Sequence, residues 1–420
     1  MTNILLINTN CSWNKGSAAQ VVSTVETLRK VIPNSRFTLV SINCPDLDAK
    51  LCSRYGVNVV GFSNKSPFSR FAYVQSFFRL SNLLLRSHIW SSFNNAGIDV
   101  DFLISENVLE QYHSSDLVID LAGDSFSDHG AFSIFPLLYG YIAVAFKKKI
   151  VVYSQSIGPF KKVMNPIAKI YLNKADLVVV RENETIEILK KIGFSNVKLA
   201  AEIAFAMKPA SQNRIEEIFA KEKVPTRVPI VGIGTNELIY KLYKSNRESY
   251  LSLTAKMADY IVEHMGAQVL LIPHVIIPEQ YAVNDDRYIS KLVLERVKHK
   301  EKIKMVTGDY SPEELKGIIG QCSLFIGSRM HSNIASLSMC VPVVALGWSH
   351  KYKGIMEMAG QGKYSMMFKT ARYTEIIQKL DEAWKNRAAI RAELESTVPV
   401  LEASVLDSGL LIRELLDLNL

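Results

Sequence analysis

The sequence predicts an α/β protein made of two Rossmann-like domains. Short apolar runs alternate with longer amphipathic stretches along most of the 420 residues, which is typical of parallel strands joined by crossover helices. Near the middle, residues 208–228 break this alternation with a polar helix between Pro209 and Pro225. A chain of this length with 48% hydrophobic residues can bury more than one core. We therefore expect two domains that face a central cleft.

The apolar runs predict the strands one by one. In chain order they are Ile4–Asn8, Phe37–Ser41, Val57–Val60, Leu117–Leu121, Ile150–Ser154, Leu177–Val180, Ile230–Gly234, Gln268–Ile272, Ile303–Val306, Leu324–Gly327 and Val343–Leu346. We place the domains at residues 1–208 and 209–375. Residues 376–420 are charged and helical in pattern, and we expect them to pack across the joint.

Composition narrows the classes of partner. A net charge of +8 favours phosphorylated substrates, nucleotides or anionic lipids, while no nucleic-acid-binding signature is present. The five cysteines form no C-x-x-C pair and no metal-like spacing with histidine, so we expect reduced thiols, a cytoplasmic location and no metal. The N-terminus does not resemble a signal peptide. Uncharged stretches at 130–146 and 330–350 are interrupted by Pro and Gly, which suits a globular interior. The oligomeric state stays open.

Residues 61–90 form a basic, aromatic-rich segment without any acidic residue. Its cations are Lys65, Arg70, Arg79 and Arg86. An amphipathic helix of this composition can lie on a membrane surface. The alternative, which we favour, is a helix whose apolar face packs on its own domain while its cations are solvated.

The most informative stretch runs from Leu324 to Ser332. A buried strand ends at Gly327, and a helix is expected to begin near Met330. Free backbone N–H groups and the helix dipole make such a turn an anion site. Arg329 adds a planar cation, and His331 adds a group that exchanges protons near neutral pH. The alternative is a capping charge and a half-buried imidazole.

The neighbouring strand strengthens the functional interpretation. Val343–Leu346 is followed by Trp348 and Lys351. Loops at the carboxyl ends of adjacent parallel strands lie together, which is where ligands bind in open α/β sheets. Arg329, His331 and Lys351 are therefore expected to face one crevice.

Polar groups also follow other predicted strands. Asp124 lies in an acidic loop after Leu117–Leu121, and it can bind sugar hydroxyls or act as a base; N-capping is the alternative. Gln155 and Arg181 end strands of the first domain, and His274 ends one of the second. Asn14 and Gly16 occupy the first strand-to-helix turn, which is not a P-loop or a G-x-G-x-x-G motif.

Taken together, these blocks resemble the polysaccharide pyruvyl transferase family. The matching pieces, in family order, are Asn14-Lys15-Gly16, Gly123-Asp124-Ser125-Phe126-Ser127-Asp128, Gln155-Ser156-Ile157-Gly158-Pro159, Arg181-Glu182, Glu202-Ile203-Ala204-Phe205, Ile272-Pro273-His274, Asp285-Asp286, Gly327-Ser328-Arg329-Met330-His331, and Lys351 with Gly354. They extend from about residue 8 to 360. Ala122 replaces a common Gly and Glu202 a usual Asp, which leaves the subfamily and the acceptor open.

The resemblance implies a GT-B-like fold and a reaction. An enolpyruvyl unit would move from phosphoenolpyruvate to a sugar hydroxyl of a glycan precursor, free or lipid-linked, for the cell envelope. The products would be a pyruvate ketal and phosphate, and no metal or cofactor is demanded. His331 would be the acid–base, Arg329 the anion clamp and Asp124 an acceptor-side catalytic group. The other implied contacts are Arg181, Ser328, Lys351 and His274 to the donor, and Asn14, Gly16 and Gln155 to the acceptor.

Two other classes of function stay open. A GT-B glycosyltransferase would use a nucleotide sugar on the same architecture. A non-catalytic relative would bind an anionic glycan or organise an assembly complex. The combination of Arg329, His331 and Lys351 argues against the second, because a binding module has no need of a proton-transfer group.

Overall fold

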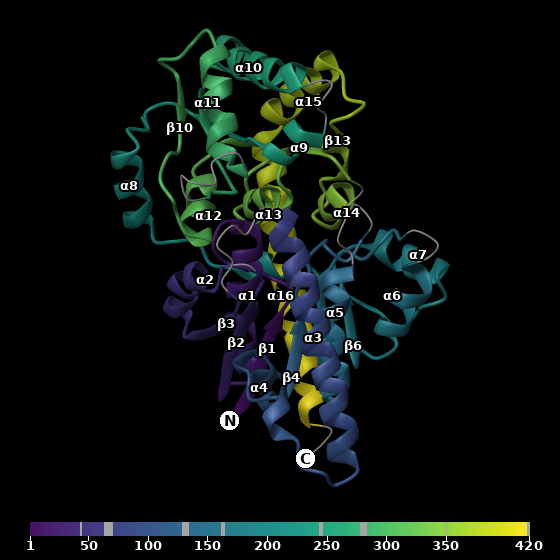
Figure 1. Cartoon of the computed structure of the whole chain (residues 1–420). Helices are drawn as coiled ribbons and strands as arrows, with labels where there is room; N and C mark the ends of the chain where they lie inside the picture. Colours follow the sequence, from purple (N-terminus) through teal and green to yellow (C-terminus); the bar gives the residue numbers. More distant parts are fainter. Residues whose placement is uncertain are drawn as a thin grey trace. The chain divides into compact units, whose positions relative to one another are not determined.

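The computed structural model describes residues 1–42, 44–62, 70–127, 134–160, 164–242, 247–277, 284–349 and 351–417 (Figure 1). The chain forms two compact units. Unit 1 comprises Met1–Ser12, Gln20–Ile203 and Ser404–Leu420. Unit 2 comprises Trp13–Ala19 and Ala204–Ala403. Each unit is built on its own parallel sheet.

Unit 1 has a seven-stranded parallel sheet in the order β3-β2-β1-β4-β5-β6-β7. Its strands are β1 (Thr2–Ile7), β2 (Ser35–Ser41), β3 (Val57–Gly61), β4 (Leu117–Asp120), β5 (Lys149–Gln155), β6 (Leu177–Val180) and β7 (Lys198–Leu199). The strand order reverses between β1 and β4, so the loops after these two strands diverge at a topological switch point. Such points are where doubly wound sheets bind ligands.

Helices connect the strands of unit 1. They are α1 (Lys15–Val31), α2 (Pro45–Cys52), α3 (Arg70–Asn95), α4 (Asn107–Ser114), α5 (Ile134–Ala145), α6 (Met164–Leu172) and α7 (Asn183–Lys191). One apolar cluster joins α3, α4 and α5 to the sheet through residues such as Leu83, Tyr112 and Ile142. A second joins the sheet to α6 and α7 through Tyr171 and Leu189.

Unit 2 has a six-stranded parallel sheet in the order β10-β9-β8-β11-β12-β13. Its strands are β8 (Ile230–Gly234), β9 (Gln268–Leu271), β10 (Ile303–Met305), β11 (Leu324–Gly327), β12 (Val343–Gly347) and β13 (Ser365–Met367). Its helices are α8 (Gln212–Lys221), α9 (Glu237–Leu242), α10 (Arg247–His264), α11 (Asp286–Arg296), α12 (Pro312–Gly320), α13 (Met330–Ser338), α14 (Lys351–Met358), α15 (Tyr373–Lys385) and the part of α16 (Arg387–Asp417) up to Ala403. The switch point here lies between β8 and β11.

These two sheets confirm the predicted α/β class and the two Rossmann-like halves. All the predicted strands are present, with ends that differ by a residue or two. Strands β7 and β13 were not predicted, because two or three residues at a sheet edge carry no apolar run that a pattern could reveal.

The compact units do not coincide with the predicted domain limits of 208 and 375: residues 204–208 and 376–403 lie in unit 2, and two further segments are assigned differently. Trp13–Ala19 belongs with unit 2 because its backbone is bonded there: Lys15 N–H donates to the His274 carbonyl, and Ile276 N–H donates to the Trp13 carbonyl. The second half of α16, from Ser404, belongs with unit 1, where the Ser408 hydroxyl lies 2.7 Å from the Tyr153 hydroxyl.

The basic, aromatic-rich segment lies mainly in α3, while residues 63–69, and with them Lys65, fall outside the described residues. One face of α3 packs as expected for the structural alternative, with Leu80 and Leu83 buried in the core of unit 1. The other face exposes Phe78 (67%) and Leu85 (59%) to solvent. Within the described part of the chain, no helix is both long enough and apolar enough to cross a bilayer.

Candidate functional site

The turn between β11 and α13 is fixed by close packing. Strand β11 is fully buried, and a Cβ atom on Gly327 would lie only 1.5 Å from the Asn333 side-chain oxygen, so only glycine fits. Arg329 then takes extended backbone angles and forms the N-cap of α13, while His331 lies in its first turn. The predicted strand, turn and helix start are therefore present, at the switch point of unit 2.

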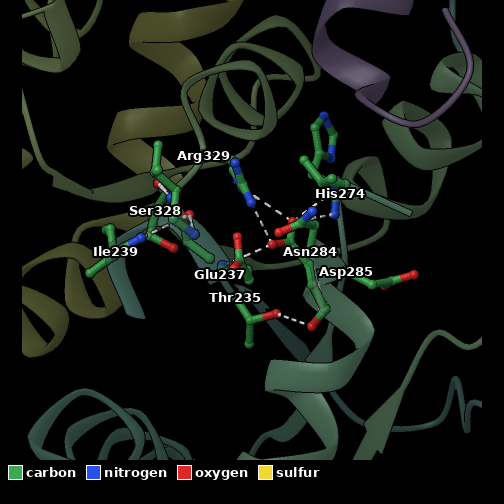
Figure 2. Close-up of polar contacts among 12 residues, drawn as sticks. Thr235, Glu237, Ile239, His274, Asn284, Asp285, Ser328 and Arg329 are labelled. Atoms are coloured by element: carbon green, nitrogen blue, oxygen red, sulfur yellow. Dashed lines mark hydrogen bonds and ion pairs between the residues drawn. The ribbon is translucent and has the colours of Figure 1, made fainter. Parts of the chain in front are cut away.

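Arg329 is held by a buried carboxylate that the sequence did not single out. Its Nε lies 3.1 Å from Asp286 Oδ2, and its Nη2 lies 2.6 Å from Asp286 Oδ1. Figure 2 draws the dashed contacts at the Arg329 guanidinium. Burial disfavours the charged guanidinium, but the Asp286 carboxylate outweighs it, and the pKa of Arg329 is raised above its usual value. Arg329 is a permanent cation in a well-defined position.

The loop after β8 braces the same turn. The Asn236 side chain caps α9 by accepting from Leu238 N–H at 2.8 Å, and its amide group donates to the Ser328 carbonyl. The Ser328 hydroxyl donates to the Gly234 carbonyl at 2.6 Å. The hydroxyl hydrogen of Ser328 is therefore used within the protein, and the predicted contact of Ser328 with phosphoenolpyruvate stays a prediction.

His274 follows β9 and is 5% exposed. Burial first, and then repulsion from His331, Arg329 and Lys15, lower its pKa to about 3. The imidazole is therefore neutral near physiological pH, in a strongly cationic neighbourhood. Its Nδ1 is buried and has no hydrogen-bond partner among the described residues.

The segment Trp13–Ala19 lies directly against this cluster. Asn14 Oδ1 accepts from Gly16 N–H at 3.0 Å and so caps α1. A Cβ atom on Gly16 would lie 2.3 Å from His331 Nδ1, so the bare glycine backbone is the surface on which the imidazole packs. Lys15, His274 and His331 line a cavity of about 10 Å³, which is about the volume one water needs.

Lys351 is the first residue of α14, directly after the loop that follows β12. Its side chain is buried, with Nζ 4.6 Å from the centroid of the Trp348 ring. Burial lowers the pKa of Lys351 to about 7, so the ammonium and the neutral amine are both accessible near neutral pH.

Three predicted site residues belong to unit 1. Gln155 is fully buried and its amide donates to Asp120 Oδ1 at 2.9 Å. Arg181 is also fully buried: Nε donates to the Ser156 hydroxyl at 2.9 Å and Nη2 to the Gly123 carbonyl at 3.2 Å. Asp124 is partly exposed, and its carbonyl accepts from the Ser127 hydroxyl. In this structure Gln155 and Arg181 tie together the strand-end loops of unit 1.

Most of the residues that the sequence predicted belong to unit 2, where His274 lies close enough to Arg329 and His331 to be repelled by their charges. The predicted residues in unit 2 are Asn14, Gly16, His274, Ser328, Arg329, His331 and Lys351. Sequence reasoning did not assign roles to Asp286 and Lys15. Both lie in sequence blocks that resemble the family, next to residues with predicted roles. Only the fold shows that they are buried and what they contact. Among the described residues, no group of three or more His, Cys, Asp or Glu side chains is placed to hold a metal ion.

The fold places the chain in the GT-B-like class of two-domain α/β proteins. A glycosyltransferase from Rickettsia africae aligns over 99% of this chain and 98% of its own, with a TM-score of 0.56 and 14% identity. A UDP-N-acetylglucosamine 2-epimerase, described as putative, from Listeria monocytogenes aligns over 97% and 94%, with a TM-score of 0.60 and 11% identity. At these identities the likeness concerns the fold alone.

Sequence similarity is more specific than the fold. Residues 14–350 match the family described as polysaccharide pyruvyl transferase, and this range includes the predicted site residues apart from Lys351, which follows it directly. The amylovoran biosynthesis protein AmsJ of Erwinia amylovora is 24% identical over 328 residues, covering 76% of this chain and 77% of that protein. The chain belongs to the polysaccharide pyruvyl transferase family, and the family makes it a transferase.

Proposed function

We propose that this protein transfers the enolpyruvyl group of phosphoenolpyruvate to a sugar of a polysaccharide precursor and closes it to a pyruvate ketal. The observation that carries the proposal is the turn after β11, which presents Arg329 and His331 at the switch point of unit 2, in a chain of this family. The relative AmsJ is named for the biosynthesis of a polysaccharide, amylovoran, which supports a glycan as the acceptor.

The chemistry explains why such residues suit this donor. A proton adds to the methylene carbon of phosphoenolpyruvate, and one sugar hydroxyl attacks C2 and loses its own proton. A second hydroxyl of the same sugar then attacks C2, the C–O bond to phosphate breaks, and inorganic phosphate leaves with the second proton. The net change turns one donor and one diol into a ketal and phosphate, without an oxidant or reductant.

The residues of unit 2 divide these tasks. Arg329 carries a permanent charge and would bind the carboxylate or phosphate of the donor. Lys351, with a pKa of about 7, would contribute a second positive charge when protonated. His331 would move the proton between the acceptor hydroxyl, a bound water and the donor, a role typically worth about 10²–10⁴-fold in rate. Because its pKa is about 3, His274 is neutral near pH 7 and would offer a hydrogen bond without adding a charge.

We assign the residues on the acceptor side from the resemblance to the family. Asp124 is the partly exposed carboxylate of the loop after β4, and we assign it to the acceptor hydroxyls. Gln155 and Arg181 would support that loop from within unit 1, because both are buried and bonded to its backbone or to Asp120. Asn14 and Gly16 would act through the position of α1 and His331.

Donor competition tests this proposal. Purified protein is incubated with glycan acceptors and either phosphoenolpyruvate or UDP- and GDP-sugars, and released phosphate and nucleoside diphosphate are measured. We expect phosphate release that requires both phosphoenolpyruvate and acceptor. Release of UDP or GDP without consumption of phosphoenolpyruvate would instead identify a nucleotide-sugar glycosyltransferase, and binding without any release would identify a non-catalytic protein.

A further inference from the structure

We propose that Asp286 is a positioning residue, which sets the Arg329 guanidinium in the orientation that binds the anionic donor. This role rests on the proposed function, since it concerns the donor's binding site. Asp286 is the first residue of α11 and is fully buried. Its importance follows from the number and origin of the groups that its carboxylate binds.

The Asp286 carboxylate accepts five hydrogen bonds. Two come from the Arg329 guanidinium, at 2.6 and 3.1 Å. The other three come from backbone N–H groups: Glu237 at 2.9 Å to Oδ1, and Val275 at 2.8 Å and His274 at 3.2 Å to Oδ2. A carboxylate with this many donors is held in one orientation.

These donors belong to different loops at the switch point. Glu237 begins the helix after β8, while His274 and Val275 lie in the loop after β9. Arg329 follows β11. The main chain of Asp286 adds to the connection, because its carbonyl accepts from the Thr235 hydroxyl at 3.1 Å. One side chain therefore fixes the loops that follow three neighbouring strands.

The ion pair also determines which part of Arg329 faces the ligand. Asp286 occupies the edge of the guanidinium formed by Nε and Nη2. Among the described residues, Arg329 Nη1 makes no recorded hydrogen bond. The edge formed by Nη1 and the second Nη2 hydrogen is therefore available for a bidentate bond to a carboxylate or phosphate. Without Asp286 the side chain would lose the contact that selects this orientation.

The adjacent Asp285 provides a matched control. It is 2% exposed and caps the same helix. It also pairs with an arginine, since Arg287 Nη2 lies 2.6 Å from its Oδ2, and it accepts from the Ile277 backbone at 2.8 Å. Asp285 thus matches Asp286 in type, burial and ion pairing and precedes it at the start of α11, but among the described residues it makes no hydrogen bond or ion pair with Arg329.

The experiment is a double-mutant cycle on the full-length protein, with phosphoenolpyruvate affinity measured by titration calorimetry and stability measured by urea unfolding. The variants are Asp286→Asn, Asp285→Asn, Arg329→Gln and the double variant Asp286→Asn/Arg329→Gln. A charge-assisted hydrogen bond contributes enough to predict about 10–100-fold weaker donor binding in Asp286→Asn. Asp285→Asn should lose stability and keep the donor affinity of the wild type.

The cycle distinguishes positioning from general destabilisation. If Asp286 acts through Arg329, the double variant binds the donor no more weakly than Arg329→Gln alone. Additive losses, an unchanged affinity in Asp286→Asn, or an equal affinity loss in Asp285→Asn would each overturn the positioning role and leave the proposed function intact. Absence of phosphoenolpyruvate binding by the wild type would overturn the proposed function, and this role with it.

Discussion

We expect Gly16→Ala to lower kcat strongly because the new side chain would displace His331, although residue 16 would not touch the reacting atoms. The new Cβ atom would lie 2.3 Å from His331 Nδ1, 2.6 Å from Cγ and 2.9 Å from Cβ. Ordinary contact needs about 3.5 Å, so the ring must move by roughly 1 Å. The new Cβ atom would also clash with the His331 Cβ atom, which does not move when the ring rotates about the Cβ–Cγ bond. Rotation of the ring alone therefore cannot relieve the clash.

The expected magnitude follows from this displacement. A misplacement of about 1 Å in a reacting group can cost roughly 10²-fold in rate, and overpacking typically costs about 1–3 kcal/mol of stability. The assay is phosphate release from phosphoenolpyruvate with acceptor, together with urea unfolding of the same preparations. We expect kcat to fall about 10²-fold in a protein that remains folded.

The variant His331→Ala supplies the control, because it removes the ring atoms that would clash. His331→Ala itself should lower turnover by about 10²–10⁴-fold without unfolding the protein. Adding Gly16→Ala to it should cost no further turnover and less stability than in the wild type, since only the contact with the residue 331 Cβ atom remains. Normal turnover of Gly16→Ala, or an undiminished stability cost in the double variant, would refute the reasoning.

Three further predictions concern charge and surface. Arg329→Lys should weaken phosphoenolpyruvate binding because a point charge replaces the planar group that also pairs with Asp286; an unchanged donor KM and kcat would rule out the anion clamp. Donor affinity should fall as pH rises through about 7, because Lys351 is cationic below its lowered pKa and neutral above it. In the control, calorimetry of Lys351→Gln measures how the ionisation of phosphoenolpyruvate itself changes its affinity with pH. An identical pH profile in the wild type and in Lys351→Gln would contradict the role of Lys351. If the exposed face of α3 binds membranes, wild-type protein should sediment with anionic liposomes, less so at high salt, and replacing both Phe78 and Leu85 with Ser should reduce binding but spare activity on a soluble acceptor. If the wild-type protein does not sediment with anionic liposomes at low salt, α3 serves only in the packing of unit 1.

Much of the fold was predictable because its signals are local. Each buried strand of the two sheets is a continuous apolar run, and parallel order follows from the alternation with helices. The Arg329 and His331 turn was predictable for the same reason, since strand, glycine and helix start are consecutive in the sequence.

The rest depends on contacts between residues far apart in the chain. Gly16 looked like a place for a ligand, but the structure fills the space above it with the His331 ring. The resemblance implied that Arg181 contacts phosphoenolpyruvate, but its side chain is fully buried and donates to the Ser156 hydroxyl and the Gly123 carbonyl. The pattern of apolar and polar residues along the sequence does not indicate such contacts. A buried carboxylate such as Asp286 is equally hidden, because in sequence it resembles an ordinary helix-capping acid.

The most direct test of the account follows the donor carbon itself. Phosphoenolpyruvate labelled at C2 with a stable carbon isotope is incubated with the protein and a glycan acceptor, and the products are examined by carbon NMR. The account predicts a label in a ketal carbon of the glycan, with one phosphate released for each ketal formed. A label that remains in phosphoenolpyruvate, or that ends only in free pyruvate, would contradict it.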